Sequence, residues 1–195
     1  LVSWGSEMCI RDSFTTVYYT VTGDVTLGSN VIKNISNITG ITSDFQVVGE
    51  GILQDSQVLS VKNNTATISI PCTETATGVT LTFGQVKYAM PSDYARMVNK
   101  TQYNKSNRWS IIGPKDAQEW QWLKASYVTT GPRMRFRMIG NKFTIWPMPA
   151  ATVVLGFEYV SNSWVTGYDG TPKNKLTNDG DTVNFPDRLM ILGTK

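Results

Sequence analysis

The residues best suited to chemistry form a basic row in the second half of the chain. The row consists of three alternating arginines and one lysine beyond a turn: Arg133, Arg135, Arg137 and Lys142. Residues 133–139 alternate basic with apolar side chains, and successive side chains of a β-strand point to opposite faces. One face would be buried and the other would carry the guanidinium groups. Such a row can follow DNA phosphates, pair with carboxylates of a neighbouring subunit, or simply face solvent.

A cluster of indole side chains close to the basic row is the second candidate site. Four of the six tryptophans lie within residues 105–148, and three are predicted to be interface aromatics: Trp109, Trp120 and Trp122. Indoles can stack on bases or sugars, but such a cluster more often belongs to a core or anchors an interface. Trp120 and Trp122 would diverge by about 200° on a helix, so one core cannot hold both. We expect one of them at an interface.

The chain lacks the groups that most enzymes use for proton transfer and metal binding. It has no histidine, and its two cysteines, Cys9 and Cys72, lack metal-ligand spacing. The carboxylates considered for a glycosidase-type pair are Asp116, Glu119, Glu158 and Asp187. No spacing singles out two of these carboxylates. We predict that the chain is not an enzyme and has no catalytic residue, no cofactor and no metal ligand.

Composition limits the class of protein further. The 195 residues are 41% hydrophobic and 17% charged, which is enough apolar sequence to build a core. A net charge of +3 is too small to predict nucleic-acid binding by itself. No apolar run approaches the roughly 18 residues that a membrane-spanning helix needs, so we predict no membrane partner.

Two helices are predicted. Asp116 is a suitable N-cap with Glu119 three residues later, which favours a helix over residues 117–125. A second helix is predicted over residues 184–192, where Pro186 stands early and an acidic residue follows in the first turn.

A β-hairpin should follow the first helix. Gly140-Asn141 suits a two-residue turn between a strand at 133–139 and a strand at 142–146, because both positions tolerate positive φ. Residues 152–160 alternate again between two faces. We expect this third strand to pair with the hairpin, because three antiparallel strands are about the minimum for a stable sheet.

Residues 21–83 differ in composition from the rest of the chain and predict an inserted, small, sandwich-like all-β module. Turn residues separate short apolar pieces at 31–35, 45–48, 57–61, 65–70 and 79–83. Asn63-Asn64 is the clearest tight turn, since asparagine enters the left-handed region readily. The predicted fold class is therefore mainly β, with an antiparallel β core, a short Trp-rich helix and this inserted module.

The connecting segments carry weaker signals. Strands are predicted at 14–19 and 85–90, and a turn or helix at 92–98. Residues 161–181 are polar and predict a long loop, which Trp164 and Tyr168 could hold against the core.

The first residues match no structural period. Within residues 1–13 the run SEMCIRDS resembles translated sequencing-adapter read-through. We therefore expect a non-native tail there and leave it out of the predicted fold. With the second helix cut short as well, the chain is expected to be truncated at both ends.

Several runs resemble tailed-phage neck proteins, namely head-to-tail adaptors and the tail tubular protein A of short-tailed phages. They are YAMPSDYAR (88–96), SNRWSIIGP (106–114), QEWQWLK (118–124), GPRMRFR (131–137) and FEYVS (157–161). The resemblance covers residues 14–20 and 84–195, which would form the adaptor core. Residues 21–83 resemble the Gly/Thr-rich β modules inserted in phage structural proteins.

This resemblance implies a structural virion protein of the head–tail junction, assembled in the host cytoplasm. Its partners would be further copies of itself in a twelve-fold ring, the portal protein, the tail nozzle and, transiently and without sequence preference, DNA in the channel. The basic row and the three tryptophans would then serve interfaces or the DNA channel. The alternative is a carbohydrate- or receptor-binding β module of a phage tail fibre, which would use exposed aromatic side chains.

Overall fold

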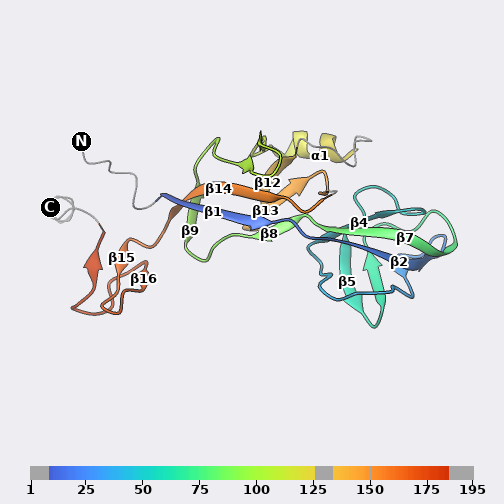
Figure 1. The fold of residues 1–195 in the computed structure, drawn as a ribbon, viewed down its shortest axis with the longest axis horizontal. Coiled ribbons are helices and arrows are strands. Elements are labelled where there is room, and N and C mark those ends of the chain that lie inside the picture. The colour runs from blue at the N-terminus through green and yellow to red at the C-terminus, as the bar shows by residue number, and fades with distance from the viewer. Residues whose placement is uncertain (1–8, 126–133, 150, 185–195) are drawn as a thin grey trace. The chain divides into compact units, whose positions relative to one another are not determined.

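The chain folds mainly into antiparallel β-structure. The structure is a computed structural model that describes residues 9–125, 134–149 and 151–184 (Figure 1). Over these residues it contains seventeen strands and one short helix, α1 (Ala117–Ala125). The predicted fold class, mainly β with a minor helical part, is confirmed.

The chain divides into two compact units. The smaller unit takes Leu1–Ser13, Pro91–Gln102 and Gly156–Lys195, and the larger unit takes Phe14–Met90 and Tyr103–Leu155. The basic row, the three predicted interface tryptophans and the 21–83 segment all belong to the larger unit.

The 21–83 segment supplies most of two three-stranded sheets. In the first, β7 (Ala76–Gln85) lies between β2 (Tyr18–Val25) and β4 (Phe45–Gly49). In the second, β6 (Thr65–Ile68) lies between β3 (Val31–Ile32) and β5 (Val58–Lys62). Asn63 and Asn64 join β5 to β6 with φ of 47° and 59°, as the tight turn required.

One apolar core serves both of these sheets. Its fully buried members come from alternate strand positions and from the connecting loops, as the short apolar pieces predicted. Among them, Ile32, Val47, Ile68, Leu81 and Phe83 have no exposed surface.

The predicted hairpin forms with the expected turn. Strands β12 (Arg135–Ile139) and β13 (Lys142–Trp146) pair antiparallel, and Gly140 and Asn141 have φ of 57° and 59°. The third strand of this sheet is β8 (Lys87–Ala89) on the other edge of β13. The prediction that residues 152–160 would be the third strand was wrong, because β8 occupies that edge.

Strand β14 (Val154–Ser161) belongs to a different sheet, whose order is β1 (Cys9–Thr15), β14, β10 (Tyr103–Asn104), β11 (Trp109–Ser110). The predicted alternation along it is confirmed, since Val153, Leu155, Phe157 and Tyr159 are buried. Residues 9–13 are part of β1, so the segment omitted from the predicted fold contributes a strand.

The smaller unit departs most from the predicted elements. Residues 94–97 form β9 (Tyr94–Met97), which pairs with β14, so the helical option at 92–98 was wrong. The predicted 161–181 loop contains β15 (Val165–Thr166) and β16 (Pro172–Lys173), and β17 (Thr182–Val183) follows it on the other edge of β15. The second predicted helix falls almost entirely on residues 185–195, outside the described residues.

Candidate interface and polar pocket

Helix α1 positions two of the candidate tryptophans. The predicted N-cap is confirmed, because the Glu119 amide donates a hydrogen bond of 2.7 Å to the Asp116 carboxylate. Glu119 itself pairs with the Lys115 ammonium at 3.0 Å. These contacts fix where the helix begins, and so fix the directions of Trp120 and Trp122.

The side chains of Trp120 and Trp122 point to different sides of α1, as predicted from their spacing of two residues. Trp120 is only 2% exposed, whereas Trp122 is 70% exposed. Trp109, on β11, is 43% exposed. Trp120 therefore belongs to the interior of the larger unit rather than to an exposed interface, because its side of α1 is covered. Of the three tryptophans predicted to lie at an interface, only Trp109 and Trp122 are exposed enough to contact another protein.

The basic row is less open than the alternating pattern suggested. Arg133 lies outside the described residues, and Arg135 and Arg137 are half-buried. Their cross-strand partners on the same face are Trp146 and Thr144, which are both buried. The hairpin was predicted to have one buried face and one exposed face. For β13 this prediction was wrong, because Phe143, Thr144, Ile145 and Trp146 are all buried.

Three lysines of the larger unit reach side chains of the 44–57 segment. The contacts are Lys142 to both carboxylate oxygens of Asp44 at 2.6 and 2.7 Å, Lys124 to Asp55 at 2.9 Å, and Lys87 to the Gln57 amide oxygen at 3.0 Å. Lys142, predicted as an interface or DNA contact, is thus engaged within its own chain. No local sequence signal could reveal this pairing, since the partners are far apart along the chain.

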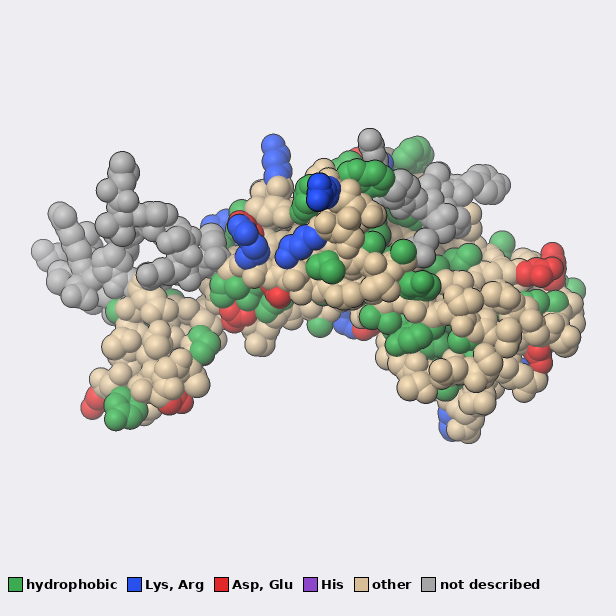
Figure 2. Space-filling model, in the orientation of Figure 1, with side chains coloured by type: hydrophobic (Ala, Val, Ile, Leu, Met, Phe, Trp, Pro, Cys, Tyr) green, Lys and Arg blue, Asp and Glu red, His purple; other side chains and the backbone are tan. Residues whose placement is uncertain are grey.

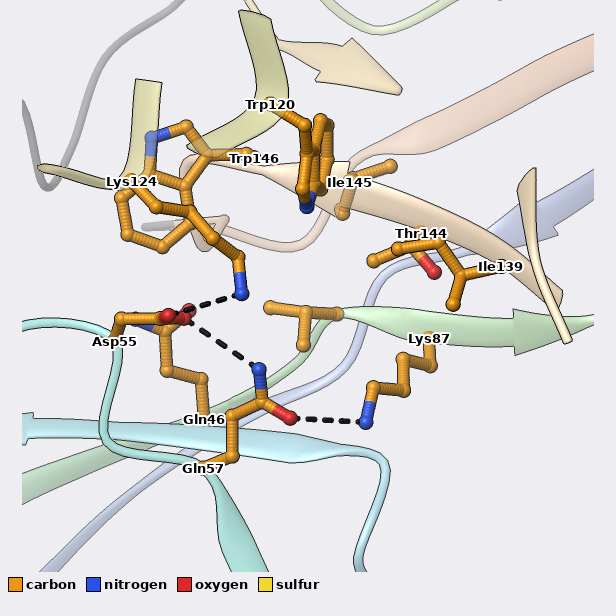
Figure 3. Close-up of a pocket in the computed structure, with 11 residues that line it drawn as sticks. Gln46, Asp55, Gln57, Lys87, Trp120, Lys124, Ile139, Thr144, Ile145 and Trp146 are labelled. Carbon is orange, nitrogen blue, oxygen red and sulfur yellow. Dashed lines mark hydrogen bonds and ion pairs between the residues drawn. The ribbon is translucent and has the colours of Figure 1, made fainter. Parts of the chain in front are cut away.

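A small pocket of about 140 Å³ lies beside two of these lysines, within the larger unit (Figure 3). It is lined by Gln46, Asp55, Gln57, Val86, Lys87, Trp120, Lys124, Ile139, Thr144, Ile145 and Trp146. The indole nitrogen of Trp120 and the hydroxyl of Thr144 are buried with no hydrogen-bond partner in the described part of the chain. Composition and spacing gave no indication of this pocket.

The half-buried carboxylate of Asp93, in the smaller unit, has structural partners. Asp93 accepts hydrogen bonds from the hydroxyls of Tyr159 at 2.9 Å and Ser161 at 2.6 Å. Burial and the bond to Asp93 raise the pKa of Tyr159 to about 12. Among the described residues no group of three or more His, Cys, Asp or Glu side chains is arranged to hold a metal ion.

A sequence model of the SU10 adaptor protein family matches residues 56–193, well over half of the chain. The chain belongs to this family. Searches of curated proteins and of solved structures gave no match. The family match begins at Ser56, inside the 21–83 segment, and continues through the hairpin and β14.

Membership of the SU10 adaptor family confirms the coarser part of the resemblance. The chain is a phage adaptor with a structural role, so its partners are other phage head or tail proteins. Contacts with such partners would be made by exposed side chains, such as those described above.

The described surface of this SU10 adaptor is sparsely charged. On the face shown in Figure 2, most Lys and Arg side chains lie over β14 and the strands beside it, with acidic side chains among them. One such pair joins Arg11 to Glu158 at 3.1 Å. Exposed cations and aromatics share the β10–β11 hairpin, which carries Tyr103, Lys105, Arg108 and Trp109. Within the described ranges, no helical segment has the length and hydrophobicity of a membrane span.

Proposed function

We propose that this SU10 adaptor forms a ring in the phage neck, in the manner of tail tubular protein A. A closed ring of twelve copies would lie between portal and tail nozzle, surround the DNA, and assemble in the host cytoplasm before entering the virion. The family match and the exposed indole of Trp122 are the observations that support this proposal most strongly.

The Trp122 indole is the strongest candidate for a subunit contact. It is 70% exposed on a helix whose start is fixed by a cap and whose other tryptophan is buried. A large rigid apolar side chain held in water is costly, and tryptophan is enriched at the residues that dominate binding energy in interfaces. Trp109 offers a second exposed indole on β11.

The arginines of the basic row are proposed to meet carboxylates of a neighbouring subunit or, transiently, DNA phosphates. Arg135 and Arg137 are half-buried, which favours direct hydrogen-bonded pairing with a carboxylate or phosphate over long-range electrostatic attraction of DNA. Lys142 is left out of this role because Asp44 holds its ammonium group.

Residues 21–83 are proposed to be an inserted module on an adaptor core made of residues 14–20 and 84–195. The core cluster supports this division in that its buried members run from Val21 to Phe83, although Val17 and Tyr19 of the 14–20 segment also pack against it. Residues 1–13 are proposed to be a non-native tail, of which residues 9–13 are part of β1.

Replacing the exposed indoles tests the proposed interface. We expect Trp122→Ala and Trp109→Ala each to weaken self-association by roughly thirtyfold, which corresponds to about 2 kcal/mol for an interface hot spot. Analytical ultracentrifugation over a concentration series measures the change. The matched control is Leu59→Ala, which removes an exposed apolar side chain from β5. If the tryptophan variants self-associate as strongly as the wild type, neither indole is part of the subunit interface.

A further inference from the structure

The pocket beside Lys87 and Lys124 has the size and lining of a small polar ligand site. Its volume of about 140 Å³ equals that of roughly four or five water molecules in the liquid, enough for a carboxylate or phosphate group. Its walls come from β4, β8, β12, β13, α1, the 55–57 segment and Val86, all within the larger unit. The strands and the helix hold these walls in place by backbone hydrogen bonds.

Two buried hydrogen-bonding groups of the pocket lack partners. Trp120 is 2% exposed, and its indole N–H can only donate. Figure 3 shows this nitrogen at the end of the ring that faces Lys124, Asp55 and Gln57. The Thr144 hydroxyl, on a residue 5% exposed, is the second group. Buried polar groups are nearly always satisfied, so two such groups on one pocket indicate a missing acceptor.

The charges of the pocket favour an anion. The lining holds two ammonium groups, those of Lys87 and Lys124, and one carboxylate, that of Asp55. Each ammonium has three N–H donors, and the contacts to Gln57 at 3.0 Å and Asp55 at 2.9 Å each use one. Donors are therefore in excess, and the Asp55 charge is already neutralised by Lys124.

We propose that this pocket binds a single small oxyanion, a carboxylate or phosphate group. The indole N–H of Trp120, the hydroxyl of Thr144 and the ammonium of Lys87 would donate to its oxygens. Such a group can come from a free anion or from an Asp or Glu side chain of a protein that docks over the pocket. This inference does not depend on ring formation.

Nuclear magnetic resonance of the indole N–H groups tests the site directly. Sodium acetate is added to the ¹⁵N-labelled chain and compared with sodium chloride at equal ionic strength. We expect acetate to shift the Trp120 indole resonance saturably, while the indole of exposed Trp122 stays in place. Trp120→Phe identifies the resonance, because it removes the N–H and keeps an aromatic ring.

Variants show which groups hold the anion. Thr144→Val, which keeps the side-chain shape, should weaken acetate binding by about fivefold, the factor expected for one lost hydrogen bond. Lys87→Gln should weaken it by at least as much, because a charge-assisted bond is lost. Lys62→Gln, which alters an exposed lysine at the end of β5, is the matched control and should leave binding unchanged.

A blocked glutamate, N-acetyl-glutamate N-methylamide, separates the two sources. Binding of this probe supports a protein side chain as the natural ligand, whereas binding of acetate or phosphate alone supports a free anion. If none of these probes moves the Trp120 indole resonance more than chloride does, the proposal is overturned. Acetate binding that is unchanged in both Thr144→Val and Lys87→Gln overturns the assignment of donors.

Discussion

At the scale of single residues, one carboxylate organises the end of the described chain. The side chain of Asp181 is fully enclosed and accepts hydrogen bonds from the amides of Thr177 at 2.8 Å, Asn178 at 3.0 Å and Tyr168 at 3.1 Å. Lys173 adds an ammonium contact at 3.1 Å. The bond from the Thr177 amide is the largest of the causes that lower the pKa of Asp181 well below its ordinary value.

This low pKa makes the 166–183 segment acid-sensitive. Because the folded pKa lies below the unfolded value, of about 3.9, the stabilisation is present above that value and is lost as pH falls through the folded pKa. We expect the amide resonances of Thr177 and Asn178 to move towards unfolded values below about pH 4. In Asp181→Asn this acid transition should be absent. Because the loss is complete only below the folded pKa, the test is the stability of the segment, measured by hydrogen exchange of these amides from about pH 5 to about pH 2. A wild-type segment whose protection does not fall over this range would contradict the role of Asp181.

The basic row gives a second prediction at this scale. Reversing Arg135 and Arg137 to Glu should impair particle assembly or DNA passage without unfolding the hairpin, because β12 pairs through its backbone. Particle yield and infectivity measure the effect, and circular dichroism checks the fold. Lys62→Glu is the control for a charge change elsewhere. Unchanged yield and infectivity would leave the row as an ordinary strand face.

At the scale of elements, short sequence patterns correctly predicted the features that depend on neighbouring residues, namely the bounds of a helix and the position of a turn. Helix α1 runs over the predicted residues 117–125 because Asp116 caps it. The hairpin turns where Gly140-Asn141 permits positive φ at both positions. Which strands pair depends on residues far apart in the sequence, and short patterns do not reveal this. Strand β14 pairs with β1, β9 and β10 rather than with the hairpin.

Polar side-chain contacts, at short and at long sequence separation, were not predicted from the sequence either. The 161–181 segment is held by Asp181, whereas Tyr168, expected to anchor it, is 84% exposed. Lys142 was predicted to contact a partner or DNA, but it binds Asp44, which is 98 positions away. Alternation assigns a side chain to a face but says nothing about what covers that face.

The cap of α1 provides the prediction for an element. Asp116→Ala should lower the free energy of unfolding by about 1 kcal/mol, because the Glu119 amide loses its acceptor. Asp116→Ser keeps an oxygen at this position and should retain most of the stability. Chemical denaturation monitored by tryptophan fluorescence measures both variants. Equal loss in the Ser and Ala variants would show that the carboxylate acts through its charge rather than as a cap.

At the scale of the whole molecule, the chain combines well-formed β-units with exposed indoles. The buried apolar cores account for the fold, but Trp109 and Trp122 contribute little to them. An adaptor needs such surfaces, because each copy must contact other proteins of the virion. Ring closure would bury the same surface on every copy, since a closed ring repeats one contact between neighbours.

The mass of the assembled protein tests the ring most directly. Native mass spectrometry should be run on the protein alone and mixed with its portal protein, including any helical segment that its reading frame places before residue 1. We expect a single closed species of twelve copies, which Trp122→Ala shifts towards monomer. A protein that stays monomeric at every concentration, with and without portal, would contradict ring formation.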